Sequence, residues 1–215
     1  MKDLIIIGAS GFGREVLWLV ERINEKSAEW NILGFVDDDL SIQGEEINGY
    51  KVIGTSDDVL KYSNSYFVCA VGASHIRKKV IEKVTKLNPN IKFATVIDPS
   101  VEMSKLHKIG VGTIICAHTI LTVNFTIGDH VIINLDCTVG HDVVLGDFDT
   151  LYPSVNVSGA VTVGKCTELG TGSQIIQCKN IGENTIIGAG AVVVSDIPDK
   201  CTAVGCPAKP IRFFE

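Results

Sequence analysis

The sequence predicts an α/β domain with a doubly wound parallel sheet over residues 1–96, followed by an all-β coil of six-residue repeats over residues 97–200. Two patterns predict this order. Short apolar runs alternate with helical spacings in the first part, and an aliphatic residue recurs at every sixth position in the second. Residues 201–215 form a C-terminal tail with the motif GCPAKP. With 46% hydrophobic and 20% charged residues, the 215-residue chain can fill a core and is not disordered.

The first part is typical of a small Rossmann-like domain, because strands that alternate with helices favour a parallel sheet. The apolar run LIII at 4–7 is typical of a strand covered on both faces. The apolar positions 16, 17, 19, 20 and 23 that follow it have helical spacing. Further along, the pattern predicts strands over 32–39, 65–72 and 92–98, a short helix over 56–62 with Ser56 as N-cap, and a helix over 74–87 that Pro89 terminates.

The second part has a period of six, which neither a helix nor an ordinary strand produces. Fifteen aliphatic residues hold the repeating position without a break in frame: Ile109, Ile115, Leu121, Ile127, Ile133, Val139, Leu145, Leu151, Val157, Val163, Leu169, Ile175, Ile181, Ile187 and Val193. Ile97 and Met103 extend the frame toward the N-terminus. Such a period predicts a coil that turns one corner per repeat, whereas an antiparallel sandwich would show irregular spacing.

Charge and cysteine usage narrow the class of protein. The chain has 19 basic and 25 acidic residues and no long Lys/Arg run. This charge balance disfavours binding to nucleic acid or to an anionic membrane. No apolar stretch approaches the ~20 residues of a bilayer span, and the apolar run near the N-terminus is too short for a signal peptide. The seven scattered cysteines contain no CxxC pair and are typical of free thiols. We therefore expect a cytoplasmic protein.

A glycine-rich loop, GASGFG, joins the first predicted strand to the first helix. Gly8, Ser10, Gly11 and Gly13 would let backbone N–H groups approach a phosphate at the N-terminus of that helix. The spacing GxxGxG differs from the dinucleotide fingerprint, and the domain is too short for two mononucleotide halves, so NAD is not favoured. A plain tight turn is the alternative.

Polar residues also follow the next two strands. Asp37 and Asp38 stand at the carboxyl end of the second strand and Gly72 ends the third, at the edge where doubly wound folds bind ligands. Carboxylates there accept hydrogen bonds from ribose hydroxyls or a base N–H. A solvated acidic turn is the alternative for the aspartates. The basic run at 77–79 is interpreted as the polar face of a helix.

As a whole, the chain resembles the NeuD/PglD-like sugar O- and N-acetyltransferases, a family of hexapeptide-repeat acyltransferases. The motifs IIIGASGFGREV, GFVDDD, AVGASHIRKK and GCPAKP, together with the repeat, carry this resemblance along essentially the whole chain. It implies a left-handed parallel β-helix with three hexads per coil, so that fifteen hexads make five coils, or about 24 Å at the ~4.8 Å strand spacing. It also implies a homotrimer with active sites in the clefts between neighbouring coils.

The resemblance further implies the reaction. Members transfer acetyl from acetyl-CoA, without a metal, to the amino group of a nucleotide-linked 4-amino-4,6-dideoxysugar, or in some cases to a hydroxyl of sialic acid or a related sugar. The glycine-rich loop, the two aspartates and Gly72 would then bind the nucleotide sugar. Transfer to an amine needs a base, placement of the thioester carbonyl and a donor for the tetrahedral oxyanion, but no covalent enzyme intermediate.

His141 matches the general base of the family, within TVGHDVVLGDF and with Asp142 as its partner. A carboxylate beside an imidazole favours the imidazolium, but successive strand residues point to opposite faces, so this contact requires a corner of the coil. Asn134 matches the family asparagine that binds the sugar's amino group, with an asparagine ladder as the alternative. We expect surface or packing roles for the other histidines: His75, His107, His118 and His130.

For the acetyl donor, the resemblance aligns Gly159 with the backbone N–H that meets the thioester oxygen. It aligns Thr171 and Ala189 with main-chain contacts to the pantetheine arm of acetyl-CoA. Thr150 is the fourth candidate for donor binding, although some members carry a second histidine at its position. Because the frame never slips between 109 and 193, the base is expected on the coil body and not on an extruded loop.

Two other functions stay open at this point. A sialic acid O-acetyltransferase would use the same chemistry, and a β-helix that binds metal or only carries structure belongs to another class. The candidate zinc ligands His118, His130 and His141 are twelve and eleven residues apart. Ligands on equivalent sides of a three-hexad coil would be about 18 apart, so these do not line up within one chain.

The last expectation concerns assembly. Flat outer faces that carry Phe125, Phe148 and Tyr152 would give the coil a partly apolar surface. A three-sided coil can close such surfaces in a C3 ring. We expect a homotrimer of about 69 kDa, three times the 23.1 kDa of the chain.

Overall fold

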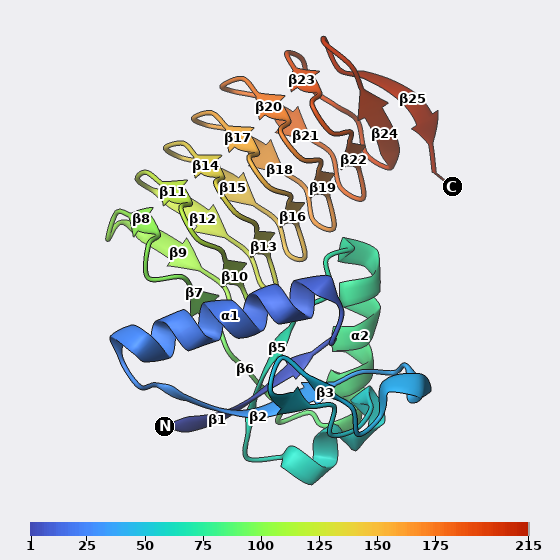
Figure 1. The fold of residues 1–215 in the computed structure, drawn as a ribbon. Coiled ribbons are helices and arrows are strands. Elements are labelled where there is room, and N and C mark those ends of the chain that lie inside the picture. The colour runs from blue at the N-terminus through green and yellow to red at the C-terminus, as the bar shows by residue number, and fades with distance from the viewer. Residues whose placement is uncertain (215) are drawn as a thin grey trace.

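The structure is a computed structural model that describes residues 1–214. Its N-terminal part is a four-stranded parallel sheet in the order β2-β1-β5-β6 (Figure 1). The elements of this part are β1 (Lys2–Ile7), α1 (Gly11–Lys26), β2 (Trp30–Val36), β5 (Tyr66–Cys69), α2 (Ser74–Leu87) and β6 (Lys92–Phe93). This is the doubly wound arrangement that the sequence predicts.

The sheet is covered on both faces, which explains the continuous apolar run of β1. Leu4 and Ile6 pack in the core that contains α1, whereas Ile5 and Ile7 pack in the core that contains α2 and the short helix η2 (Ser56–Tyr62). Within residues 1–214, no helix combines the length and apolarity needed to cross a membrane.

Several short elements differ from the prediction. The 3₁₀ helix η1 (Leu40–Ile42) and the hairpin β3 (Glu46–Ile47) and β4 (Tyr50–Lys51) had no clear sequence signal. The N-cap of η2 is Thr55, so the assignment of Ser56 was wrong: Thr55 accepts from the N–H of Asp57 while the Asp58 carboxylate accepts from the N–H of Thr55. This reciprocal pair is a capping box, which gives acceptors to two backbone N–H groups at the N-terminus of the helix.

The single strand predicted over 92–98 was also wrong. It is two short strands in different sheets, β6 in the N-terminal sheet and β7 (Val96–Ile97) at the start of the coil. Ala94 and Thr95 separate them. Phe93, Ala94, Val96 and Ile97 form one apolar stretch across both strands, and periodicity alone does not reveal the change of sheet.

From β7 onward the chain winds as a parallel β-helix with three sheets, as its six-residue period predicts (Figure 1). Each strand pairs with the strand one coil further along, as Ile115 pairs with Ile133. The strands are β8 (Glu102–Met103), β9 (His107–Ile109), β10 (Ile114–Ile115), β11 (Ile120–Leu121), β12 (Phe125–Ile127), β13 (Ile132–Ile133), β14 (Thr138–Val139), β15 (Val144–Leu145), β16 (Thr150–Leu151), β17 (Asn156–Val157), β18 (Thr162–Val163), β19 (Glu168–Leu169), β20 (Gln174–Ile175), β21 (Asn180–Ile181), β22 (Ile186–Ile187) and β23 (Val192–Val193).

The corners of the coil explain the period. Most corners contain one non-glycine residue whose backbone is in the left-handed region. The φ angles of these corner residues lie between 53° and 63° from His118 to Asn184. This bend recurs every six residues and returns the aliphatic position to the interior each time. Almost all of the fifteen repeating residues are therefore buried in one continuous core, against which Ile109 packs partly buried.

The coil is longer than the five turns expected from fifteen hexads. β7 and β8 precede the first of them, and β24 (Cys201–Val204) continues one sheet after β22. The last coil has fewer residues than the others. Glu168 pairs with Ile186, eighteen residues further on, whereas Ile186 pairs with Thr202, only sixteen residues further on. β25 (Lys209–Phe213) then pairs antiparallel with β24, so most of the C-terminal segment belongs to the sheet.

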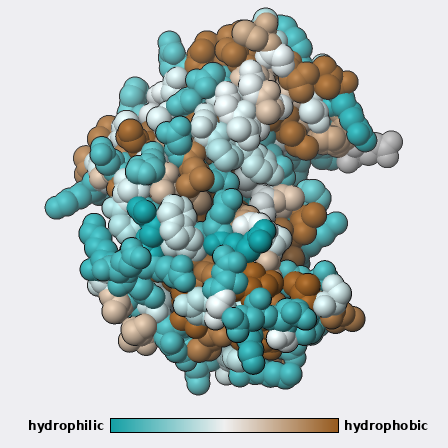
Figure 2. All heavy atoms as spheres, viewed as in Figure 1, coloured by the Kyte–Doolittle hydropathy of each residue, from teal (hydrophilic) through white to brown (hydrophobic). Residues whose placement is uncertain are grey.

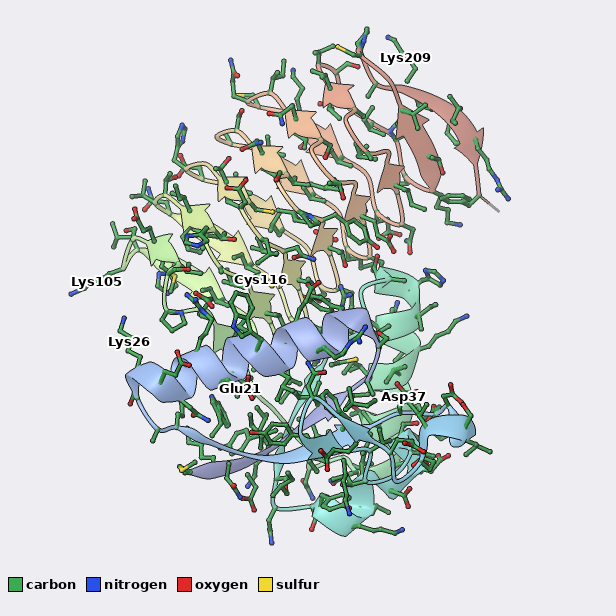
Figure 3. The ribbon with its side chains drawn as sticks, in the orientation of Figure 1. Glu21, Lys26, Asp37, Lys105, Cys116 and Lys209 are labelled. Carbon is green, nitrogen blue, oxygen red and sulfur yellow. The ribbon has the colours of Figure 1, made fainter. Side chains whose placement is uncertain are left out.

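The two parts of the chain share a core. Ile114, Cys116 and Ile132 of the coil pack with the residues of α1 and β1, and Figure 3 shows Cys116 directly beside α1. An ion pair between Arg22 and Asp98, 2.7 Å from Nε to Oδ2, adds a polar contact at the same boundary. Figure 2 shows that the surface is hollowed on one side, where the two parts meet.

The aromatic residues predicted on exposed outer faces lie elsewhere. Phe125 is only 1% exposed and belongs to the core of the coil, with His107 stacked on it. Phe148 packs against His130 between the two parts, and Tyr152 donates a hydrogen bond to Glu168. That expectation was wrong, because side chains of the same chain cover these rings.

Candidate active site

The glycine-rich loop begins at the carboxyl end of β1. Gly8 has a φ of +100°, which side chains rarely adopt, and a Cβ on Gly13 would overlap the Gly8 carbonyl oxygen. The first turn of α1 therefore packs directly against the end of β1. The N–H groups of Gly11, Phe12 and Gly13 have no intrahelical acceptor, since they belong to its first turn. Ser10 is the N-cap residue, but its hydroxyl makes no capping bond. This arrangement can hold an anion.

Asp37 fastens this loop to the end of β2. One carboxylate oxygen accepts from the N–H of Ala9 at 2.8 Å and the other from the N–H of Asp39 at 3.0 Å. Figure 3 shows Asp37 at the edge of the sheet where its strands end. Asp37 therefore shapes the loop, and it also lines the adjacent cavity.

Asp38 is bound to the start of η2. Its carboxylate accepts from the N–H and the hydroxyl of Ser56, at 2.8 and 2.9 Å, and from Lys83 at 3.4 Å. Burial alone would raise the pKa of Asp38, but the bonds from Ser56 and Lys83 outweigh it and lower that pKa. We name the cavity beside it the strand-end cavity; it is lined by Ile7, Gly8, Val36, Asp37, Asp38, Ser56, Val71, Ile76 and Val80.

A second cavity lies between the two parts of the chain. We name it the interdomain cavity; it is lined by Phe12, Glu15, Gly72, Ile132, Asn134, Thr150 and Tyr152. Val71 lines the strand-end cavity and Gly72 lines the interdomain cavity, so the loop at 71–72 lies between them. A ligand that occupied both would cross this loop.

Asn134 brings a polar group of the coil into the interdomain cavity. Its Oδ1 accepts from the N–H of Leu135 at 2.7 Å, which fixes the orientation of the amide. The equivalent positions one coil away are occupied by Cys116 and Tyr152, so the asparagine ladder considered as an alternative does not exist.

Thr150 lies in the same cavity but has its hydroxyl engaged. Oγ1 donates to the carbonyl of Gly72 at 2.8 Å and accepts from Nη2 of Arg77 at 2.9 Å. Its side chain is buried on the face of the coil that meets the α/β domain. This hydroxyl therefore links the two parts of the chain, and its single hydrogen is already donated to Gly72.

His141 lies at a corner of the coil, as its contact with Asp142 requires. Asp142 has a φ of 59°, and the bend brings its Oδ2 to 2.8 Å from Nδ1 of His141. The His141 side chain is 62% exposed, so Nε2 can reach a ligand outside the coil. On the next coil, a Cβ on Gly159 would overlap the imidazole ring. Glycine at 159 thus leaves room for His141 and keeps its own N–H near the ring.

The predicted donor residues lie on two different corners. His141 and Gly159 share one corner, whereas Thr171 and Ala189 lie on the corner that also carries Leu135. Asn134 precedes the latter corner. The two corners are joined by about five extended residues, roughly 16 Å at the usual rise of a strand. One chain therefore does not bring His141 together with Asn134, Thr171 or Ala189.

The other histidines are also dispersed. His118, His130 and His141 lie on three different corners, and among residues 1–214 no three His, Cys, Asp or Glu side chains gather as metal ligands. His130 is buried between Phe93 and Phe148, and His75 is exposed at the start of α2.

The structure adds residues that sequence reasoning missed. Glu15 enters the interdomain cavity from the first turns of α1, a position that the helical spacing after Gly11 could have indicated. Glu168 accepts from the N–H of Ser74 and from the hydroxyl of Tyr152, at 2.8 and 3.0 Å, and so ties α2 to the coil. Burial and the Glu168 carboxylate raise the pKa of Tyr152 to about 12. No local pattern predicts such a contact between distant segments.

Comparison with known proteins matches both parts of the chain. Residues 3–84 match the family model described as the PglD N-terminal domain. A GDP-perosamine N-acetyltransferase of Escherichia coli O157:H7 is 31% identical over 203 residues, covering 93% of this chain and 81% of that protein. The acetyltransferase domain of PglB from Neisseria gonorrhoeae, solved with acetyl coenzyme A, has a TM-score of 0.86 at 33% identity, covering 98% of this chain and 99% of that one. PerB from Caulobacter crescentus, solved with CoA and GDP-perosamine, has a TM-score of 0.88 at 29% identity, covering 99% and 98%.

A β-helix with a histidine–carboxylate pair at one corner, joined to an α/β domain with a glycine-rich loop, is thus the architecture of an acetyl-CoA-dependent sugar acetyltransferase. Within that class the chain belongs to the PglD-like acetyltransferases, the family its sequence resembles.

Proposed function

We propose that this protein is an N-acetyltransferase that acetylates the amino group of a nucleotide-linked 4-amino-4,6-dideoxysugar. The observation that carries the proposal is the pair of cavities on either side of the loop at 71–72. The nucleotide and its phosphates fit the first cavity, beside Gly8, Asp37 and the first turn of α1. The sugar then crosses Gly72 and presents its amine beside Asn134. The substrates in the names of the two perosamine-related proteins support this class of acceptor.

His141 is the proposed general base. Its Nδ1–H donates to Asp142, which leaves the lone pair of Nε2 to accept a proton from the attacking amine. The amine nitrogen forms a bond to the thioester carbon of acetyl-CoA, and the C–S bond then breaks to release the CoA thiolate. The proton on Nε2 passes to that sulfur, so the imidazole is regenerated. The free N–H of Gly159 is the proposed donor to the tetrahedral oxyanion.

The separation of the two corners supports a homotrimer. A cleft between neighbouring copies would bring the corner of His141 and Gly159 from one copy against Asn134 and the corner of Thr171 and Ala189 from the next. Acetyl-CoA in that cleft would contact both corners, which one chain alone does not bring together. Light scattering should give about 69 kDa, three times the 23.1 kDa of the chain. A monomer at micromolar concentration would remove this shared cleft.

The test of function is an acetyl-CoA thiol-release assay with a panel of acceptors. UDP-, GDP- and dTDP-linked 4-amino-4,6-dideoxysugars form one arm, and free sialic acid forms the other. Turnover with one or more of the nucleotide-linked amino sugars, and N-acetylated product by mass spectrometry, is the expected result. Turnover with sialic acid alone would instead identify an O-acetyltransferase, the alternative considered from the sequence.

A further inference from the structure

Arg77 is a buried cation at the boundary between the α/β domain and the coil. It lies in the first turn of α2 and is 1% exposed, so the interpretation of the run at 77–79 as a polar helix face was wrong for this residue. Burial lowers the pKa of Arg77, but a guanidinium in a protein keeps its proton. A buried charge requires partners, and those of Arg77 are unusual because none of them is a carboxylate.

Its guanidinium donates in two directions. Toward the α/β domain, Nη1 donates to the carbonyls of Val71 and Gly72, at 2.7 and 2.8 Å. Toward the coil, it bonds two successive turns: Nε to the carbonyl of His130 at 2.9 Å, and Nη2 to the carbonyls of Phe148 and Asp149 and to Oγ1 of Thr150, at 2.7, 3.0 and 2.9 Å. The bonds on one side hold the loop at 71–72, and those on the other hold the wall of the interdomain cavity.

This geometry is specific to arginine. The planar fork presents five N–H donors in fixed directions, whereas a lysine ammonium has three donors at a single point. Thr150 strengthens the link, because its hydroxyl donates to the Gly72 carbonyl that Arg77 also binds. Two donors therefore hold the carbonyl of Gly72. One is the hydroxyl of Thr150, which belongs to the coil, and the other is the guanidinium of Arg77, which is itself hydrogen-bonded to the coil.

We infer that Arg77 is a positioning residue for the acetyl acceptor. It holds the loop at 71–72 in place, and this loop lies on the path from the strand-end cavity to Asn134 in the interdomain cavity. The inference rests on the proposed function, because it assumes that the substrate spans both cavities. Neither a nucleoside diphosphate alone nor acetyl-CoA crosses this loop in that arrangement, so their binding should not depend on Arg77.

Arg77→Lys tests this inference, with Lys79→Met on the exposed face of the same helix as the matched control. The expected result is a loss in kcat/KM for the nucleotide amino sugar of about 10²-fold, the effect typical of a 1 Å misplacement. The Kd of the matching nucleoside diphosphate and the KM of acetyl-CoA should stay near wild type. Lys79→Met should change none of the three.

Thr150→Val is the second variant, in case Arg77→Lys does not fold. It removes one bond to Gly72 and one from Arg77, so it should produce the same selective loss at smaller size. Scanning calorimetry adds a readout that needs no substrate: the wild type should unfold in one transition, and Arg77→Lys should separate the α/β domain from the coil.

Wild-type kcat/KM in both variants would overturn the inference, as would a weaker Kd for the nucleoside diphosphate together with a higher KM for acetyl-CoA that match the loss in kcat/KM. A smaller folded fraction lowers kcat but not Kd or KM, so rates are compared per folded enzyme. An inactive wild type on every amino sugar would instead refute the proposed function. The calorimetric transition would still report whether Arg77 couples the two parts.

Discussion

The imidazole ring of His141 occupies the space that a side chain at position 159 would need. Gly159 lies one coil beyond His141 on the same corner, and its missing Cβ leaves the Nε2 edge of the ring uncovered by the chain. The oxygen that develops negative charge and the nitrogen that loses a proton would therefore meet groups on adjacent coils.

Gly159→Ala should displace the ring of His141 and lower kcat. The φ of Gly159 is outside the left-handed region, so alanine should not strain the backbone there. Steady-state kinetics should show a loss of about 10²-fold, comparable to a 1 Å misplacement, with a thermal midpoint near wild type. Full activity in a folded variant would show that the position of the ring is not critical.

His141→Asn should preserve the fold and the KM of acetyl-CoA, because the side chain is exposed and acts on a proton in transit. The loss should fall on kcat, by about 10²–10⁴-fold as for other general bases. Asp142→Asn should cost less, since it removes only the acceptor that orients Nδ1–H. If His141→Asn kept more than about a tenth of wild-type kcat, His141 would not be the base.

Glu15 should select an amine over a hydroxyl at the acceptor position. Its carboxylate lines the interdomain cavity and would bind the ammonium form of the sugar. Glu15→Gln should raise the KM of the amino sugar nucleotide by about tenfold, the size of one charge-assisted hydrogen bond.

The control for Glu15 is Glu21→Gln, two turns further along the same helix and away from that cavity. A 4-hydroxy analogue used as a competitive inhibitor should bind wild type and Glu15→Gln equally. If the analogue lost affinity together with the substrate, the carboxylate would not read the charge of the amine.

Stability should fall in acid because of His130. It is 5% exposed, and burial lowers its pKa from 6.5 to about 4. A lowered histidine pKa means that the unfolded chain binds the proton first, so folded stability is highest above pH 6.5 and decreases as pH falls toward 4. The effect is on the order of 3 kcal/mol over that range.

Urea unfolding of the wild type and of His130→Gln at pH 7 and pH 5 would measure this contribution. The variant should lose less stability between the two pH values, and the exposed His118→Gln should behave as wild type does. An identical pH dependence in wild type and His130→Gln would assign acid sensitivity to other groups.

The repeat made the inward positions of the coil predictable from Ile109 to Val193, because each of them must be aliphatic and each corner must bend sharply. It did not predict the shorter last turn or β25. His141, Asp142 and Asn134 could be found only by motif, since the hexad period does not mark chemistry. Their separation on two corners follows from the period, but whether a second copy closes the distance does not.

The boundary between the two parts was the least predictable region. Arg77 stands in a basic run that fits a solvated helix face, and nothing local indicates that carbonyls 53 to 72 residues away surround it. Contacts of this kind depend on how two completed folds meet, so neither periodicity nor spacing reports them.

A stack of parallel coils is a template without an inherent end, because its last strand offers free N–H and C=O groups on which another coil, or another molecule, could grow. β25 reverses direction on that template and places Pro210, which lacks an N–H, between Lys209 and Arg212. Figure 3 shows Lys209 at this far end of the coil. The antiparallel strand thus caps one of the three sheets of the coil, so that this sheet no longer offers a parallel edge on which a further coil could add.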